Sequence, residues 1–458
     1  MTTSPAAASR PVHFPALHRV HDRGWINDPN GILHHDGRWH VYFQYNPAAS
    51  RHGDIEWGHM ASTDLVSWQR EPAGPVRRPG EADRGGCWSG VGLVDTAADG
   101  TPVPTLVYSG VDGVASHLAQ VLVARTDERL EQVTRTTLAA PVPAGVALEG
   151  VRDPFLVELD GRRWGIQGAG IREGDQVVPA VLLYDATDLE HWEYLGPLLT
   201  GHDPVAAEHV PAEIWECPQL VRVGEDWVLM VSLWFREDRV PGSITESAYL
   251  VGSLAIGEGG LPVYRPRSGG TVDRGPDFYA PQAVADPTQE RVLTWGWSWE
   301  HRTRTQEQTD AQGWAGCLTF PRALSLDGDV LVSTPAAELA ALRGEELALA
   351  GVGAGEGSVD ETAGVSADGA GRALVLCAPF RAEARLTGPA RVVLRRADGT
   401  EETLLEHDGG AATLLLDGGI AELLPAAATP TTVRLYPGDE DAVVLIGAID
   451  EAWELRLP

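Results

Sequence analysis

The stretch TDLVSW at residues 63–68 recurs as TDLEHW at residues 187–192, an offset of 124 residues. The tetrapeptide DGRW at residues 36–39 recurs at the same offset as DGR at residues 160–162, with Trp164 close behind. Two matches in one register indicate an internal repeat. A repeat is informative early, because it constrains the whole fold before any single element does.

Half of this offset gives a repeating unit of about 62 residues, and five such units fit before residue 340. Each step of one unit comes to a polar, chemically reactive segment. These segments are Asp28, Trp88-Ser89, Asp153, Glu216-Cys217-Pro218 and Asp277-Phe278-Tyr279. The tripeptide NDP at residues 27–29 falls onto RDP at residues 152–154. We therefore expect Asp28, Asp153 and Glu216 at equivalent strand starts in three of the units.

Short runs of β-forming residues fill the units, and Asp-Gly pairs at 36–37, 99–100 and 160–161 predict hairpins between them. The runs that predict strands are Trp39–Tyr45, Thr105–Ser109, Gln120–Ala124, Val181–Tyr184, Trp227–Trp234 and Val292–Trp297. Helical periodicity is nearly absent. About four strands in each of five units predict an all-β protein built on a five-bladed β-propeller.

The composition changes after Arg322, where tryptophan and histidine become scarce. We expect the propeller domain at residues 1–335, a linker at residues 336–357 and a C-terminal β-sandwich at residues 358–458. Within the linker region, Pro335–Leu349 predicts a short helix and the glycine-rich stretch 351–357 predicts a loop.

The chain of 458 residues carries a formal net charge of −30 and contains no lysine. This charge disfavours nucleic acid and anionic membranes as partners, and the missing lysine excludes Schiff-base and phosphate-loop chemistry. The N-terminal residues show no export signal, so we expect a cytoplasmic protein. The four cysteines are far apart and form no CxxC pair, which predicts isolated thiols, with Cys87, Cys317 and Cys377 buried.

Inner strands of a propeller converge on its central channel, so Asp28, Asp153 and Glu216 are expected to face one another there. Crowded carboxylates raise the pKa of at least one of the group. A protonated acid beside an ionised carboxylate is what glycoside cleavage requires. Indole rings around such a cluster suit the apolar face of a sugar.

Eight segments in order over about 300 residues closely resemble glycoside hydrolase family 32, the family of β-fructofuranosidases, invertases, levanases and fructan exohydrolases. The segments are WINDPNG (25–31), FQYNP (43–47), WGH (57–59), CWSG (87–90), RDP (152–154), WECP (215–218), DFYA (277–280) and WAG through PR (314–322). The resemblance implies a five-bladed propeller followed by a β-sandwich, and retaining chemistry without a metal or an organic cofactor.

Carried over residue by residue, the resemblance implies Asp28 as the nucleophile, Glu216 as the acid/base and Asp153 as the stabiliser of the transition state. The expected substrate is a neutral fructose-containing carbohydrate, and both a monomer and a homodimer stay open. The residues that we assign to substrate binding are Trp25, Asn27, Gln44, His52, Trp57, Trp88, Ser89, Arg152, Cys217, Tyr279 and Trp297.

One departure concerns His52, which lies eight residues after Gln44 where many invertase-like members have a pocket tryptophan. The subsite beyond the scissile bond is therefore expected to be unusual. An exo-acting β-fructosidase is the first hypothesis, with sucrose, fructo-oligosaccharides, levan-type, inulin-type and phosphorylated substrates all open. The alternatives are a fructosyltransferase that forms difructose or oligosaccharides with the same three residues, and a carbohydrate-binding propeller without catalysis.

Overall fold

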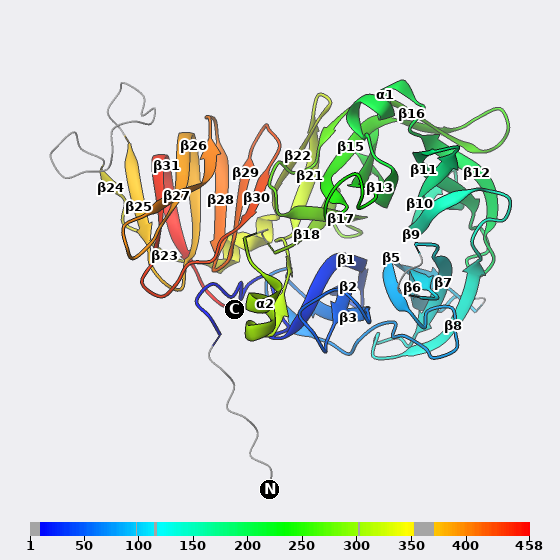
Figure 1. The fold of residues 1–458 in the computed structure, drawn as a ribbon, viewed down its shortest axis with the longest axis horizontal. Helices are drawn as coiled ribbons and strands as arrows, with labels where there is room; N and C mark the ends of the chain where they lie inside the picture. Colours follow the sequence, from blue (N-terminus) through cyan, green and yellow to red (C-terminus); the bar gives the residue numbers. More distant parts are fainter. Residues whose placement is uncertain (1–9, 98, 114–116, 301–302, 352–370) are drawn as a thin grey trace, which may run out of the picture.

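The computed structural model describes residues 10–97, 99–113, 117–300, 303–351 and 371–458. A ring of five antiparallel sheets forms one part of the molecule, and a second body of long strands lies beside it (Figure 1). The first three blades contain β1 (Gly24–His35), β2 (Arg38–Asn46), β3 (Glu56–Ser62), β4 (Gln69–Arg70); β5 (Gly86–Thr96), β6 (Pro102–Val111), β7 (Gln120–Thr126), β8 (Val133–Ala140); and β9 (Leu148–Leu159), β10 (Arg162–Glu173), β11 (Gln176–Asp185), β12 (Glu193–Thr200).

The last two blades complete the ring. They contain β13 (Ile214–Val223), β14 (Asp226–Trp234), β15 (Ile244–Ile256), β16 (Pro262–Thr271); and β17 (Phe278–Ala285), β18 (Val292–Ser298), β21 (Arg322–Asp327), β22 (Val330–Pro335). The first strands β1, β5, β9, β13 and β17 contact one another in turn, and β17 contacts β1. The predicted five-bladed propeller is confirmed, and its inner strands surround one central funnel.

The repeated sequence patterns serve the same purpose in blades 1 and 3. Asp36 and Gly37 have φ values of 48° and 72°, and the next repeat has 51° and 72° at residues 160 and 161, as a two-residue type I′ hairpin requires. The Trp68 indole N–H donates to the carbonyl of Leu65 at 3.2 Å, and Trp192 donates to Leu189 at 2.9 Å. The repeat read from the sequence therefore corresponds to a repeat in space.

Two short strands close the ring near its ends. β19 (Trp314–Ala315) pairs in parallel with β1, and β20 (Cys317–Leu318) pairs with β18. Helix α1 (Pro204–His209) precedes blade 4, and α2 (Gln306–Gln312) precedes β19. A capping box in which Thr305 and Gln308 satisfy each other's backbone begins α2, and Gly313 ends it at φ 75°.

The C-terminal body is a sandwich whose two sheets share two long strands. Its strands are β23 (Arg343–Glu346), β24 (Ala350–Gly351), β25 (Arg372–Leu376), β26 (Arg381–Arg395), β27 (Glu401–His407), β28 (Ala412–Asp417), β29 (Ile420–Pro425), β30 (Thr431–Arg434) and β31 (Ala442–Leu455). The first half of β26 pairs with β28 and its second half with β27, while β31 follows it throughout. The register breaks between Leu386 and Ala390, beside Gly447, where both strands pass from one sheet to the other.

The linker differs in part from its prediction. Instead of an α-helix over Pro335–Leu349, a 3₁₀-helix spans only Ala337–Leu342 and leads directly into β23. Leu339 and Leu342 pack into an apolar cluster with sandwich residues. The helical segment therefore extends only as far as Leu342, the second of the two leucines that this packing buries. Most of the predicted loop 351–357 and the predicted boundary at residue 358 lie outside the described residues.

The propeller and the sandwich meet through buried ion pairs. Arg322 of β21 contacts Asp273 at 2.9 Å and Glu422 of β29 at 2.5 Å. His18 lies between Asp417 and Glu422, at 2.9 and 3.0 Å. Paired buried charges are costly to separate, so these contacts hold the two bodies in one relative position.

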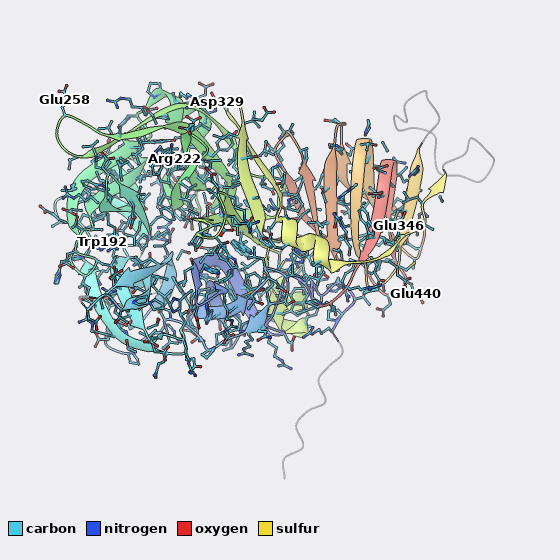
Figure 2. All side chains as sticks on the ribbon, turned by 180° about the vertical axis from the view of Figure 1, so that it is seen from behind. Trp192, Arg222, Glu258, Asp329, Glu346 and Glu440 are labelled. Carbon is cyan, nitrogen blue, oxygen red and sulfur yellow. The ribbon has the colours of Figure 1, made fainter. Side chains whose placement is uncertain are left out.

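Charged side chains cover the outside of both bodies, with Glu258, Glu346 and Glu440 at the periphery (Figure 2). Within the described part of the chain, no helix is long and apolar enough to cross a membrane. Cys87 and Cys317 are buried, but Cys377 is exposed because it lies in the turn between β25 and β26. The prediction that this third thiol is buried is therefore wrong.

Candidate active site

Each inner strand carries a bulge at the same depth in the funnel. The ladder between the first and second strands is interrupted in all five blades, at 27–28, 89, 153–154, 217–218 and 280–281. Proline follows the bulged residue in four blades and Gly90 in the other. Proline has no N–H to continue the ladder, so the sequence itself imposes the interruption. Bulges redirect side chains, here toward the axis.

The bulges correct the phase of the sequence repeat. The equivalent positions are Asp28, Ser89, Asp153, Cys217 and Ala280. Glu216 therefore lies one residue before this ring, level with Asn27, Trp88, Arg152 and Tyr279. Its expected equivalence to Asp28 and Asp153 is wrong by one residue, because the true marker is the residue before the proline. The trio still converges, on two adjacent levels rather than one.

Asp28 is held by donors from four strands. Its Oδ2 accepts from Ser89 Oγ at 2.5 Å and from Gln44 Nε2 at 3.0 Å. Its Oδ1 accepts from Asn27 Nδ2 at 3.1 Å. The Cys217 thiol lies 3.6 Å from Oδ2. The carboxylate is thus fixed mainly through Oδ2, which leaves Oδ1 the less engaged oxygen.

Asp153 links blade 3 to the blades on both sides. Its backbone N–H donates to Ser109 Oγ of β6 at 2.7 Å, and its Oδ2 accepts from the backbone N–H of Cys217 in β13 at 2.9 Å. The Cys217 thiol lies 3.6 Å from the same oxygen. One thiol therefore touches both Asp28 and Asp153, which places the two carboxylates on either side of it.

Both oxygens of the Glu216 carboxylate are engaged. Arg152 Nε donates to Oε1 at 2.8 Å, and the Tyr279 hydroxyl donates to Oε2 at 2.7 Å. The Arg152 guanidinium also lies over the Trp234 ring, 5.4 Å from its centroid. These partners fix the orientation of the carboxyl group toward the space shared with Asp28.

Burial dominates the electrostatics of the cluster. It raises the pKa of Asp28 against the hydrogen bond from Ser89, and the nearby Glu216 charge adds to the rise. Burial also raises the pKa of Asp153, to about 7. The Arg152 charge opposes this rise, and the charges of Glu216 and Asp28 add to it. Burial keeps the pKa of Tyr279 and of Cys217 well above ordinary values, so both retain their protons. Burial, reinforced by the charges of neighbouring carboxylates, thus raises the pKa of both Asp28 and Asp153.

Aromatic rings form one wall of the funnel. Trp25 and Trp297 meet edge to face at 5.5 Å, and Trp299 lies 6.2 Å from Trp297. Trp297 is buried against Tyr279 and Cys217, whereas Trp25 and Trp299 are partly exposed. This arrangement offers apolar indole surface beside Tyr279 and Cys217.

A second aromatic wall lies on the side of Glu216. The Trp88 ring contacts His52 at 5.9 Å and His117 at 6.4 Å, and His117 lies 5.2 Å from Trp234. His52 is exposed, but neighbouring protein atoms partly desolvate its imidazole and lower its pKa, and desolvation together with the Arg152 charge lowers the pKa of His117. Both imidazoles are therefore uncharged at neutral pH.

Trp57 is the one predicted substrate-binding residue that lies apart from the funnel. It has 0% exposure, packs against Tyr42 and Tyr108 between blades 1 and 2, and donates to the carbonyl of Trp88 at 3.1 Å. The assignment of Trp57 to direct substrate contact is wrong, because the ring is enclosed by the core. It supports Trp88 from behind.

Sequence reasoning missed His117, Trp234 and Ser109. His117 lies in no run of β-forming residues, and Trp234 is the last residue of a predicted strand, where nothing in the sequence marks it as part of a site. Ser109 is a small residue within a predicted strand, where nothing distinguishes it from ordinary packing. Only the relative position of neighbouring blades shows that all three adjoin the carboxylate cluster.

Comparison with known proteins agrees with the fold of a five-bladed propeller followed by a second β-domain. The family profile described as the glycosyl hydrolases family 32 N-terminal domain matches residues 18–335. The chain belongs to glycosyl hydrolase family 32.

Two curated relatives are similar to more than two thirds of the chain. The chain is 31% identical to a sucrose-6-phosphate hydrolase of Zymomonas mobilis over 353 residues, and 30% identical to a raffinose invertase of Escherichia coli over 346 residues. These matches cover 73% and 72% of the chain, but only 64% and 66% of the relatives. The chain thus spans about two thirds of the length of either relative.

Solved structures show the same fold over nearly the whole chain. A glycoside hydrolase family 32 structure from Bifidobacterium adolescentis superposes with a TM-score of 0.77 at 20% identity, covering 96% of this chain and 81% of that one. A family 32 β-fructofuranosidase of Bombyx mori gives a TM-score of 0.73 at 20% identity, covering 98% and 95%. The similarity therefore includes the sandwich.

Proposed function

We propose that this protein is a retaining β-fructofuranosidase, which releases terminal fructose from sucrose and short fructosides. The observation that carries the proposal is the cluster of Asp28, Asp153 and Glu216, in which fixed hydrogen-bond donors hold each carboxyl group. Family membership and the names of the relatives, a raffinose invertase among them, support the same reaction class.

In the proposed first step, Asp28 Oδ1 attacks the anomeric carbon of fructose. A bond forms between this oxygen and the carbon, the glycosidic C–O bond breaks, and Glu216 gives its proton to the departing oxygen. In the second step Glu216 takes a proton from water, and the resulting hydroxide displaces Asp28. The donors from Ser89 and Gln44 on Oδ2 keep the nucleophile oriented for both steps.

Asp153 and the first aromatic wall hold the fructose ring. Positive charge develops on the ring as the glycosidic bond breaks, and hydrogen bonds from ring hydroxyls to Asp153 strengthen as it does. Trp25 and Trp297 offer an apolar surface to the ring. Asn27 and Arg152 adjoin the same space as further hydroxyl partners.

The leaving group is assigned to the second aromatic wall, because that wall adjoins the proton donor Glu216. Its two imidazoles, His52 and His117, are neutral, and the guanidinium of Arg152 is already paired with Glu216. A chain with net charge −30 and no lysine favours a neutral leaving sugar over a phosphorylated one. We therefore expect sucrose to be preferred over its phosphate ester.

The test is chromatography of products after incubation with sucrose, sucrose 6-phosphate, and short inulin-type and levan-type oligosaccharides. The proposal predicts free fructose, with a higher kcat/KM for sucrose than for its phosphate ester. Larger or cyclic products would establish transfer instead of hydrolysis. Binding of these sugars without turnover would establish a carbohydrate-binding propeller.

A further inference from the structure

The backbone of Asp153 has a conformation that a side chain rarely adopts in a strand. Its φ is 60°, and Cys217 and Ala280, at the same place in the next two blades, have φ values of 47° and 46°. In this left-handed region the backbone N–H leaves the sheet ladder and needs another partner. The partner comes from the preceding blade in each of these three cases.

The partner is found at one recurring position on the second strand of the preceding blade. Ser109 of β6 pairs in register with Trp88 and accepts from the N–H of Asp153 at 2.7 Å. Ser232 of β14 pairs in register with Glu216 and accepts from the N–H of Ala280 at 3.1 Å. Both serines have 0% exposure, so their hydroxyls do not contact bulk water.

Blade 3 has no serine at the equivalent position of its second strand. Gly168 of β10 is the equivalent of Ser109 and Ser232, since it pairs in register with Arg152. A Cβ atom there would lie 2.0 Å from the carbonyl oxygen of Trp215, so no side chain fits. The N–H of Cys217 has instead the carboxylate of Asp153 as its partner, at 2.9 Å.

Asp153 is consequently held at both ends by neighbouring blades. Blade 2 holds its backbone through Ser109, and blade 4 holds its carboxylate through Cys217. We infer that Ser109 is a positioning residue for Asp153, and that its hydroxyl sets where the carboxylate meets the fructose ring. This inference rests on the proposed function for its kinetic consequence, but not for its structural one.

The experiment is a double-mutant cycle that combines Ser109→Ala with Asp153→Asn, with kcat/KM on sucrose as the readout. Ser109→Ala is expected to lower kcat/KM about 10-fold or more when Asp153 is intact, and to have little further effect when it is combined with Asp153→Asn. Ser109→Thr retains the hydroxyl and is expected to recover most of the loss. Ser232→Ala removes the matching bond at Ala280 and serves as the control, with the same effect in both backgrounds.

A second readout does not depend on turnover. A carbon-13 titration of the Asp153 carboxyl is expected to move toward the ordinary aspartate range in Ser109→Ala, because a displaced carboxyl is better hydrated, and to stay unchanged in Ser232→Ala. Equal effects of Ser109→Ala in both backgrounds, together with an unmoved titration, would overturn the inference. Absence of fructose release by the unaltered protein would overturn the proposed function alone, because the titration would still test Ser109.

Discussion

At the residue scale, one backbone arrangement presents different chemistry in each blade. The bulge holds a carboxylate in blades 1 and 3, a hydroxyl in blade 2 and a thiol in blade 4, at Asp28, Asp153, Ser89 and Cys217. The hydroxyl and the thiol both contact the Asp28 carboxylate. The fold therefore supplies the positions, and the residue types at those positions supply the proposed nucleophile, the proposed stabiliser and the donors that contact Asp28.

The proposed roles of Asp28 and Glu216 can be separated by comparing sucrose with a substrate that carries a good leaving group. Glu216→Gln is expected to lower kcat on sucrose about 10³-fold or more but to affect an activated aryl fructoside much less, because an aryl oxide leaves without protonation. Asp28→Asn is expected to lose both activities. Steady-state kinetics on the two substrates measures this, and equal losses in Glu216→Gln would contradict its role as the acid.

The raised pKa of Asp153 makes a prediction about stability. Because its pKa is raised from 3.8 to about 7, the stability that the protonated group provides is complete below the unfolded value and is lost as the pH rises through about 7. Asp153→Asn removes that loss, so the variant should melt at a higher temperature than the wild type above about pH 7. Calorimetry from about pH 4 to about pH 9 checks this. A variant that melts below the wild type at the alkaline end would contradict it.

At the element scale, the inner strands combine long β-ladders with one break each. β9 pairs with β10 on both sides of residues 153–154, so the bulge is stabilised from both directions. Tight backbone contacts lie around these breaks. A Cβ at Gly90 would lie 2.0 Å from the Val107 carbonyl oxygen, and a Cβ at Gly168 equally close to Trp215.

Gly90→Ala tests how much the blade 2 bulge contributes. The added methyl group meets backbone rather than a movable side chain, so we expect a loss of roughly 2–3 kcal/mol in unfolding free energy. The kcat/KM should fall as well, because Ser89 would shift away from Asp28. Gly259→Ala is the matched control, since a Cβ there meets nothing within 4 Å, and it should change stability by less than about 0.5 kcal/mol. Denaturant unfolding of both variants measures this difference. Equal losses of unfolding free energy in the two variants would contradict this account.

Strands and hairpins were predictable because they depend on local sequence. The six strands predicted in the propeller all lie within observed strands, and the Asp-Gly hairpins at residues 36–37 and 160–161 follow from φ values that those residues tolerate. The offset of Glu216 from the bulge was not predictable, since a repeat of about 62 residues does not define a phase to one residue. The roles of Ser109 and His117 depend on contacts between blades, which a single sequence does not reveal.

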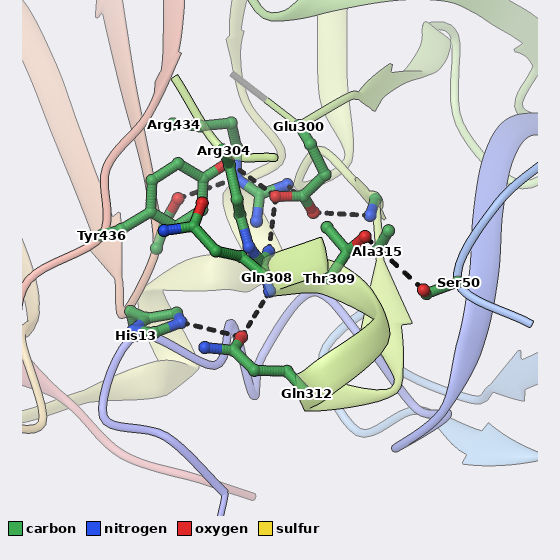
Figure 3. Close-up of polar contacts among 12 residues, drawn as sticks. His13, Ser50, Glu300, Arg304, Gln308, Thr309, Gln312, Ala315, Arg434 and Tyr436 are labelled. Atoms are coloured by element: carbon green, nitrogen blue, oxygen red, sulfur yellow. Dashed lines mark hydrogen bonds and ion pairs between the residues drawn. The ribbon is translucent and has the colours of Figure 1, made fainter. Parts of the chain in front are cut away.

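At the scale of the whole molecule, the sandwich supports the wall of the funnel. Glu300 follows the strand that carries Trp297, and its carboxylate accepts from the backbone N–H of Gly316 at 2.7 Å and from the Tyr436 hydroxyl of the sandwich at 2.6 Å (Figure 3). Arg304 and Arg434 pair with the same carboxylate. The sandwich thus contacts the segment that closes blades 5 and 1.

Glu300→Gln tests this connection through pH. Burial alone would raise the pKa of Glu300, but Arg434 and Arg304 outweigh it and lower the pKa from 4.5 to about 2. The stability that Glu300 provides is therefore present above about pH 4.5 and is lost as the pH falls through about 2. We expect the variant to lose roughly 3 kcal/mol at neutral pH, a difference that shrinks in acid.

The control for this prediction is Glu307→Gln, which changes an exposed glutamate of α2 close by and should have little effect at any pH. Thermal melts of the three proteins at several pH values make the comparison. If the difference in melting temperature between the wild type and Glu300→Gln stays constant down to about pH 2, the Glu300 charge is not its source.

The most direct test of the central claim is the anomeric form of the product trapped with methanol. Incubation with sucrose in water containing methanol, followed by proton NMR, identifies the anomer of the methyl fructofuranoside, which does not mutarotate as free fructose does. Nucleophilic attack by Asp28 followed by a second displacement predicts the β-anomer, and Asp28→Asn should form none. Formation of the α-anomer would contradict a covalent fructosyl intermediate on Asp28.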